Sequence, residues 1–474
     1  MRSRDKGLAR RWLLALSMVA LVASGSSGCT SAHDLGGIRI SEGTHGRSFG
    51  AAEVAERSAG AVGVVVTNNG RGLGFVIDPA GYMITNRHVV EDADHIEMVS
   101  FPGLKSVPEY AQVDVVYIDP VRDLALLHIR TEDRLPHLEL ATAGGRAPVS
   151  DYLAERDAVV LLSREVDPDE AAAMEVDPGL LARTGHVERL EVYNPSVGPG
   201  PFLGVTAQIE QGQSGGPVLD RHGRAVGVVT WTWRDQKGGF AIPITEAARM
   251  LVERPRLDSE AARHSRAEER VRAYVAALGT GSQDELRRLT SPSHAREVRG
   301  RTVEVLLERS TEESILQSFL TGIDQLLLET ASDSSSDPFP VFERMVARTG
   351  TDEFMGDLGV RGKMSGETVQ TFFFEIGSAY MAARLFGDYG RRDAMLVAYQ
   401  RVYSLDAARS MALLDSVDGL RGVNAELQGV EVSPGIHAPR AVATVDIGRG
   451  RRIAVQMRME WGDWYISEIQ QMSL

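Results

Sequence analysis

The sequence predicts a multidomain chain in which an all-β domain is followed by an α+β domain. Up to about Ile244, the apolar residues form short runs separated by turns that contain glycine, proline or aspartate, which is typical of β-strands. Beyond Ile244 the apolar spacing becomes helical, as at Val271, Tyr274, Val275 and Leu278. The end of the chain returns to strand-like segments. We therefore expect a second domain that contains both helices and a sheet.

The composition and charge of the chain fit this organisation. Its 474 residues suit about two domains with connecting segments, and 43% hydrophobic and 24% charged residues are ordinary for a globular protein. The net charge is −14, and removing residues 1–28, with five basic residues and one acidic residue, takes it to −18. Nucleic-acid binding is therefore not expected. The sequence has no calcium loop, His-Glu-x-x-His motif or Cys/His cluster, so we expect no metal and no cofactor.

The segment Gly212–Pro217 (Gly-Gln-Ser-Gly-Gly-Pro) has the pattern of a nucleophilic serine set among glycines. A serine hydroxyl is a weak nucleophile, so it needs an imidazole base whose tautomer is fixed by a carboxylate. Glycines let the chain direct two amides at one point, and we expect the backbone N–H groups of Gly212 and Ser214 to form an oxyanion hole. The segment also fits Gly-x-Ser-x-Gly, the nucleophile elbow of α/β-hydrolases. That alternative needs a helix after the serine, whereas Gly-Gly-Pro and a strand-turn-strand pattern over 217–230 follow here.

His88 and Asp123 are the residues that would complete such a site. His88 follows two strand-like runs joined by a turn at 78–81, which places it at a strand end, where catalytic groups are commonly displayed. An isolated histidine is more often simply hydrogen-bonded or exposed, so this setting is what distinguishes His88 from the other histidines. Asp123 opens a buried strand candidate, and we rank it above its neighbours Asp119 and Asp133. The acid and the base therefore both precede the serine in the chain.

Four segments resemble the trypsin-like serine proteases of the HtrA/Deg group. They are 72–90 (GLGFVIDPAGYMITNRHVV), 123–127 (DLALL), 212–218 (GQSGGPV) and 239–243 (GFAIP). The resemblance covers about residues 53–252 and implies two six-stranded β-barrels with the site between them. His88 and Asp123 would come from the first barrel and Ser214 from the second. By the same resemblance, His88 is the general base, Asp123 orients it and Ser214 forms the acyl-enzyme.

The resemblance also implies a substrate pocket, to which we assign Gln208, Thr230 and Trp231. The base of that pocket lies six residues before the nucleophile, at Gln208, which is uncharged, so no strong preference for Arg or Lys is expected. If Trp231 or Trp233 lines the pocket, small aliphatic side chains are favoured; the alternative is that both cover the barrel core. Gln213 stands where this group usually has Asn and zymogen-activated relatives have Asp. Activation by an inserted N-terminus is therefore not expected.

Two classes of function remain open from the sequence. The first is a serine endopeptidase that acts on unfolded or damaged cell-envelope proteins. The second is a protein that keeps the protease fold but only binds or scaffolds. The presence of all three site residues favours the enzyme, because a silent relative would be expected to have lost one of them.

The N-terminus has the arrangement of an exported lipoprotein. Basic residues precede an apolar run over 12–23, which is short for a membrane span, and small residues then lead to Cys29. The ending Ser-Ser-Gly-Cys resembles a bacterial lipobox, although that pattern prefers Leu where Ser26 stands. Cys29 is the only cysteine, so it has no partner for an intrachain disulfide. We expect a signal peptide over 1–28 and a lipid anchor at Cys29, with an outer-membrane location facing the periplasm. The alternative is ordinary cleavage with an incidental cysteine.

Three segments outside the folded cores have compositions of their own. Residues 29–52 are rich in Gly, Ser and His and read as a flexible tether. An acidic insertion over 163–183 reads as a solvated surface. A charged linker is expected over 253–268, between the protease-like domain and the domain over 269–474.

The C-terminal domain is expected to be helical in its middle and to end in a β-meander. Helices are expected over 315–328, 369–385 and 394–414, and strands over 429–432, 441–447, 452–461 and 464–469. The last strand pair resembles the closing hairpin of NTF2-like domains; the alternative is an unrelated α+β domain. HtrA/Deg proteins usually carry a PDZ domain here, but no Gly-Leu-Gly carboxylate-binding loop occurs beyond residue 252. Capture of a substrate C-terminus by a PDZ domain is therefore not expected.

Overall fold

The computed structural model divides into two compact units. It describes residues 31–472 except 44–45, 103–107, 143–146, 165–179, 194–198, 210–211, 233–237, 313, 333–336, 388, 418–419, 421–422 and 434–438. Unit 1 comprises Met1–Val89, His95–Val115 and Val121–Glu253, and unit 2 comprises Val90–Asp94, Val116–Pro120 and Arg254–Leu474. The expected signal peptide, Cys29 and most of the acidic insertion lie outside the described residues. Within the described part, no helix is both long and apolar enough to cross a membrane.

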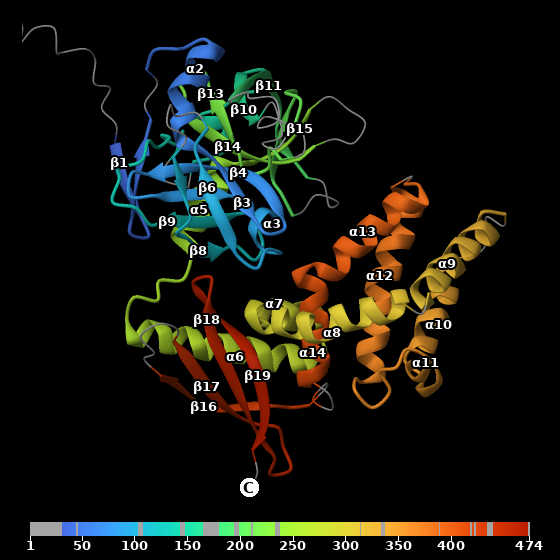
Figure 1. The fold of residues 1–474 in the computed structure, drawn as a ribbon. Coiled ribbons are helices and arrows are strands. Elements are labelled where there is room, and N and C mark those ends of the chain that lie inside the picture. The colour runs from blue at the N-terminus through green and yellow to red at the C-terminus, as the bar shows by residue number, and fades with distance from the viewer. Residues whose placement is uncertain are drawn as a thin grey trace, which may run out of the picture. The chain divides into compact units, whose positions relative to one another are not determined.

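The first sheet of unit 1 has seven strands in the order β7-β6-β3-β4-β5-β9-β8 (Figure 1). Its strands are β3 (Val62–Thr67), β4 (Gly70–Asp78), β5 (Tyr82–Thr85), β6 (Ile96–Ser100), β7 (Glu109–Tyr110), β8 (Val113–Ile118) and β9 (Ala125–Ile129). The expected first barrel had six strands. The sheet differs because the two-residue strand β7 adds a member at one edge, and β7 and β8 remain as end strands.

The second sheet closes into a six-stranded barrel in the order β10-β11-β12-β15-β14-β13. Its strands are β10 (Ala158–Arg164), β11 (Leu180–Val192), β12 (Phe202–Val205), β13 (Pro217–Asp220), β14 (Ala225–Thr232) and β15 (Gly239–Pro243). Pairing of β13 with β10 closes the ring. The helix α5 (Ile244–Glu253) follows β15 directly and buries its apolar face. This barrel confirms the all-β prediction for this part of the chain.

The segment before the first sheet is folded, which corrects the expected tether over 29–52. Strands β1 (Ser31–Leu35) and β2 (Ile38–Glu42) form an antiparallel hairpin, and α2 (Ala51–Ser58) follows. Ile38 and Ile40 alternate onto one face and are fully buried. The amide of Leu140 donates to the Ser41 carbonyl at 3.0 Å. The Gly, Ser and His content of the segment concealed this short alternating pattern.

Unit 2 combines helices with an antiparallel four-stranded sheet. The helices are α6 (Glu260–Thr280), α7 (Gln283–Leu289), α8 (Pro292–Glu312), α9 (Ile315–Ser332), α10 (Phe339–Thr349), α11 (Asp352–Asp357), α12 (Gly366–Phe386), α13 (Arg391–Tyr403) and α14 (Leu405–Val417). The strands β16 (Glu426–Ser433), β17 (Arg440–Asp446), β18 (Arg452–Glu460) and β19 (Asp463–Met472) pair in chain order, as the expected meander requires. Figure 1 shows α6 lying across this sheet.

Two hydrophobic cores support unit 2. One joins α6 to the sheet through residues such as Tyr274, Val455 and Trp464. The other lies among the helices, around Phe319 and Phe372. The expected linker over 253–268 is helical from Glu260 onward, because the Ser259 side chain caps the helix by accepting the Ala262 amide at 3.1 Å.

Candidate active site

The register of the first sheet brings His88 and Asp123 to the same edge. Thr85, at the end of β5, pairs with Ala125, at the start of the antiparallel strand β9. The residues that follow β5 and those that precede β9 therefore lie side by side. His88 lies in α3 (Arg87–Val90), a single helical turn that begins two residues after β5 ends.

Hydrogen bonds fix the relative position of the His88 ring and the Asp123 carboxylate. His88 Nδ1 lies 2.7 Å from Asp123 Oδ2, and the His88 amide donates to Oδ1 at 3.0 Å. An ionised carboxylate can only accept, so Nδ1 carries the proton and Nε2 is the atom that can accept one. The carboxylate is 13% exposed and the imidazole 32%. The ring is therefore oriented on one side and accessible on the other.

The charge state of Asp123 follows from opposing effects on its pKa. Burial raises the pKa of the carboxyl group, because the charged form loses hydration. The hydrogen bond and charge of His88, together with the hydrogen bond from Thr230, outweigh burial and lower the pKa below its ordinary value. Asp123 is thus an anion at neutral pH. An anion at this position stabilises the imidazolium that forms when His88 accepts a proton.

Thr230 links the Asp123 carboxylate to Ser214. Its hydroxyl donates to Asp123 Oδ2 at 2.6 Å, and its carbonyl accepts the Ser214 hydroxyl at 3.2 Å. The Thr230 side chain is therefore buried against the carboxylate, and its assignment to a substrate pocket remains a prediction. For proton transfer, the Ser214 hydroxyl has to turn from this carbonyl to the imidazole; such realignment on substrate binding is common at catalytic hydrogen bonds.

Glycines shape the loop that carries Ser214. Gly212 and Gly215 have φ angles of +90° and +87°, a region that other residues rarely adopt. A Cβ atom at Gly215 would lie 2.0 Å from the Leu73 carbonyl oxygen, so no larger residue fits there. The Leu73 amide donates to the Ser214 carbonyl at 2.7 Å, which ties the serine to β4 of the first sheet. The assignment of the Gly212 and Ser214 amides as oxyanion donors remains a prediction.

Asn86 is a site residue that the sequence reasoning missed. Its side chain is fully buried and donates to the Asp123 carbonyl at 2.8 Å. The contact fastens the loop before β9 to the chain just before α3. A polar residue at the end of an apolar strand, two positions before His88, was the available signal. Its partner lies 37 positions further along the chain.

The remaining pocket residues are not assembled in the described part of the structure. Gln208 is exposed. Trp231 belongs to β14, but its side chain and the whole of Trp233 lie outside the described residues. Asp123, and neither Asp119 nor Asp133, is the aspartate hydrogen-bonded to His88 Nδ1. Asp133 accepts from the Tyr110 hydroxyl at 3.5 Å. The predicted specificity therefore stays a prediction.

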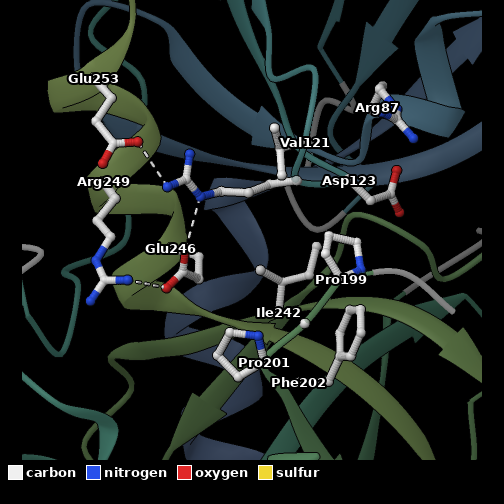
Figure 2. A pocket seen from close by; sticks show the side chains of 12 residues that line it. Arg87, Val121, Asp123, Pro199, Pro201, Phe202, Ile242, Glu246, Arg249 and Glu253 are labelled. Atoms are coloured by element: carbon white, nitrogen blue, oxygen red, sulfur yellow. Dashed lines mark hydrogen bonds and ion pairs between the residues drawn. The ribbon is translucent and has the colours of Figure 1, made fainter. Parts of the chain in front are cut away.

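A cavity of about 370 Å³ lies next to Asp123 in unit 1. Figure 2 shows Asp123 and Val121 on one side, α5 with Glu246 and Glu253 on another, and Pro199, Pro201 and Phe202 below them. The cavity thus combines an apolar floor with charged walls. Among the described residues, no cluster of three or more His, Cys, Asp or Glu side chains could hold a metal ion.

Comparisons with known proteins find similarity over one part of this chain. Residues 72–228 match the family model of the trypsin-like peptidase domain. The "probable periplasmic serine endoprotease DegP-like" of Chlamydia pneumoniae is 30% identical over 185 residues, which are 38% of this chain and 33% of that protein. The serine endoprotease DegS of Salmonella typhimurium is 28% identical over 187 residues, 38% of this chain and 47% of the relative. A solved serine endoprotease from Yersinia pestis is 23% identical with a TM-score of 0.34, over 44% of this chain and 68% of the other.

The matched segment runs from β4 to the first half of β14, contains His88, Asp123 and Ser214, and is similar to trypsin-like peptidase domains. The same part of the chain is similar to the DegP-like and DegS serine endoproteases. The chain spans less than half the length of these two relatives.

Proposed function

We propose that this protein is a serine endopeptidase in which His88, Asp123 and Ser214 form the catalytic triad. The observation that carries the proposal is the hydrogen-bonded chain from His88 Nδ1 through Asp123 and Thr230 to Ser214. It joins a base and an anion at the first sheet to a nucleophile at the second, and His88 and Ser214 lie more than a hundred residues apart in the sequence. The match to a trypsin-like peptidase domain gives independent support.

The proposed reaction follows from the atoms that these residues present. Ser214 Oγ attacks the carbonyl carbon of the scissile peptide bond as His88 Nε2 takes its proton, and the carbonyl oxygen becomes an oxyanion that faces the Gly212 and Ser214 amides. The C–N bond then breaks, and the imidazolium gives its proton to the leaving amine. Water, deprotonated by the same imidazole, cleaves the acyl ester and restores Ser214. Asp123 stays ionised throughout and stabilises the imidazolium.

The proposed substrates are unfolded or damaged polypeptides of the cell envelope, and Cys29 is the proposed lipid anchor. The Chlamydia pneumoniae relative is named as a probable periplasmic protein, which supports export of this chain. The N-terminal sequence supports the same location. Because Gln208 is uncharged, we expect small aliphatic residues before the cleaved bond, and a peptide-library profile dominated by Arg or Lys would refute this preference.

The catalytic assignment is tested by a fluorophosphonate probe, which reacts only with an activated serine. We expect labelling of the folded protein, mapped by peptide mass spectrometry to Ser214 and abolished in Ser214→Ala. Labelling should also drop sharply in His88→Ala, in which the nucleophile is present but lacks its base. A folded protein that the probe does not label would favour the binding or scaffolding alternative.

A further inference from the structure

Arg122, the residue directly before Asp123, ties the Asp123 loop to helix α5. Its Nε donates to Glu246 Oε2 at 2.8 Å, and one of its terminal nitrogens donates to Glu253 Oε2 at 2.8 Å. Both ion pairs appear as dashed lines beside the cavity (Figure 2). The loop follows the first sheet's strand β8, whereas α5 follows the last strand of the barrel. The contact therefore joins the two halves of unit 1.

Helix α5 is a firm anchor for this contact. Ile244, Ala247, Ala248 and Leu251 on its other face are fully buried. Glu246 and Glu253 are seven residues apart, about two helical turns, so they lie on the same face. The Glu246 side chain is 9% exposed, and its second oxygen accepts from Arg249 at 2.7 Å. Two cations thus balance two carboxylates, and the planar guanidinium of Arg122 can engage both at once.

Packing alone does not hold the Asp123 loop on this side. The loop borders the cavity of about 370 Å³ rather than closely packed side chains. The side chain of Val121 is 58% exposed, so burial of this residue fixes the loop only weakly. The hydrogen bond from Asn86 fastens the Asp123 backbone from one direction. The Arg122 ion pairs hold the loop from another direction, through helix α5.

We propose that Arg122 is a positioning residue for the reaction, and that its ion pairs with Glu246 and Glu253 set where the Asp123 carboxylate meets His88. Here Arg122, Glu246 and Glu253 are called the clasp. The proposal rests on the catalytic role given to Asp123 above. In this proposal Arg122 acts through the residue next to it and not on the substrate.

The test uses variants of the clasp in the full chain, with a matched control. Arg122→Met keeps the aliphatic length and removes the ion pairs, while Glu246→Gln removes the buried negative charge. Arg130→Met is the control: Arg130 follows β9 of the same sheet, is more exposed, and pairs with Asp114 instead. Arg122→Lys tests whether a single point charge can replace the guanidinium fork.

We expect Arg122→Met to lower kcat by about tenfold or more, because small misplacements of catalytic groups are costly. KM should stay within about twofold, since the clasp does not bind substrate. The Arg122→Met, Glu246→Gln double variant should lose little more than Arg122→Met alone, as members of one network are not additive. Arg122→Lys should recover only part of the rate.

A second readout does not depend on turnover. The His88 Nδ1 proton, hydrogen-bonded to a carboxylate, should give a low-field proton NMR signal that Asp123→Asn abolishes. We expect Arg122→Met to shift or broaden that signal while Arg130→Met leaves it unchanged. An unchanged signal and rate in Arg122→Met, or equal losses in both variants, would overturn the clasp. An inactive wild-type protein that still shows the clasp-dependent signal would instead contradict the proposed function.

Discussion

Gln213, the neighbour of the proposed nucleophile, holds a buried amide without a hydrogen-bond partner. The residue is 3% exposed, and neither its side-chain oxygen nor its nitrogen has a partner among the described residues. A buried polar group left unpaired costs about 1–3 kcal/mol of folding free energy. Such costs concentrate at functional sites, where the strained arrangement is retained for activity. The unpaired amide of Gln213 is therefore expected to lower the stability of the folded protein.

Replacing Gln213 by Met should stabilise the protein, because the side chain keeps its size and loses the unpaired amide. We expect the free energy of unfolding to rise by about 1–2 kcal/mol, measured by urea unfolding. Gln208→Met, at an exposed position in the same strand-to-loop region, should change it by less than about 0.5 kcal/mol. A clear loss of stability in Gln213→Met would show that the amide is satisfied in solution.

At the scale of single residues, only the site residues with a distinctive local sequence could be predicted. His88 and Asp123 lie at strand ends that the apolar runs mark, and the glycines mark Ser214. The contact between Thr230 and Asp123 was missed, because it spans 107 positions and depends on how two sheets meet. Pairings of this range follow from the fold and leave no local pattern.

Among the elements, segments with strong periodicity were predicted best. The strands expected over 441–447 and 452–461 match β17 and β18 to within about a residue, because buried and exposed residues alternate along them. Helix α8 was missed, since its sequence is mostly polar. Its first turn is supported from a distant strand: the Ser293 amide donates to Glu460 Oε2 at 2.9 Å. The expected helix over 394–414 is two helices, α13 and α14, which meet at Ser404.

Asp463 holds the start of β19 to helix α6, and its removal should destabilise unit 2. The buried carboxylate accepts from Arg266 at 2.7 and 2.9 Å and from Arg270. Burial raises its pKa, but the two arginines outweigh burial and lower it. Removing one member of a buried ion pair costs about 3–5 kcal/mol, so we expect a loss of at least about 2 kcal/mol for Asp463→Asn at pH 7 because the arginines are partly exposed. Urea unfolding followed by the fluorescence of buried Trp464 measures it.

The pH dependence of that loss follows from the lowered pKa. The stabilisation is present above the ordinary carboxyl value of 3.8 and disappears as pH falls through the folded-state pKa. The difference between wild type and Asp463→Asn should therefore be constant near neutrality and shrink at strongly acidic pH. Asp446→Asn, whose carboxylate accepts a local amide from Gly448, is the control and should show a smaller loss. A pH-independent difference would contradict the role given to the ion pairs.

At the scale of the whole molecule, the sequence predicted the all-β and α+β division but not the folded N-terminal segment. Residues 29–52 have the composition of a tether, yet the hairpin begins at Ser31, two residues after Cys29. Three residues, Ile38-Arg39-Ile40, carry the only strand signal, which is too short to outweigh the polar surroundings. If Cys29 is acylated, the hairpin therefore begins close to the anchor point in the sequence.

The anchor itself predicts a change in partitioning. Cys29→Ser removes the only thiol that could be lipidated, so the exported protein should move from the membrane fraction to the soluble fraction. Detergent phase separation and metabolic labelling with a palmitate analogue measure both effects. Ser26→Leu, which moves the sequence toward the usual lipobox, should leave the protein membrane-bound. A Cys29→Ser variant that still enters the detergent phase would place the anchor elsewhere.

The central claim, that Ser214 is the nucleophile of an endopeptidase, is tested most directly by the rate at which the full chain cleaves an unfolded protein. Wild type and Ser214→Ala are compared at equal concentration after both are shown to be folded. The account predicts cleavage by wild type and a loss of about 10⁴-fold or more in Ser214→Ala. Retention of more than about a tenth of the wild-type rate, or no cleavage by either protein, would contradict it.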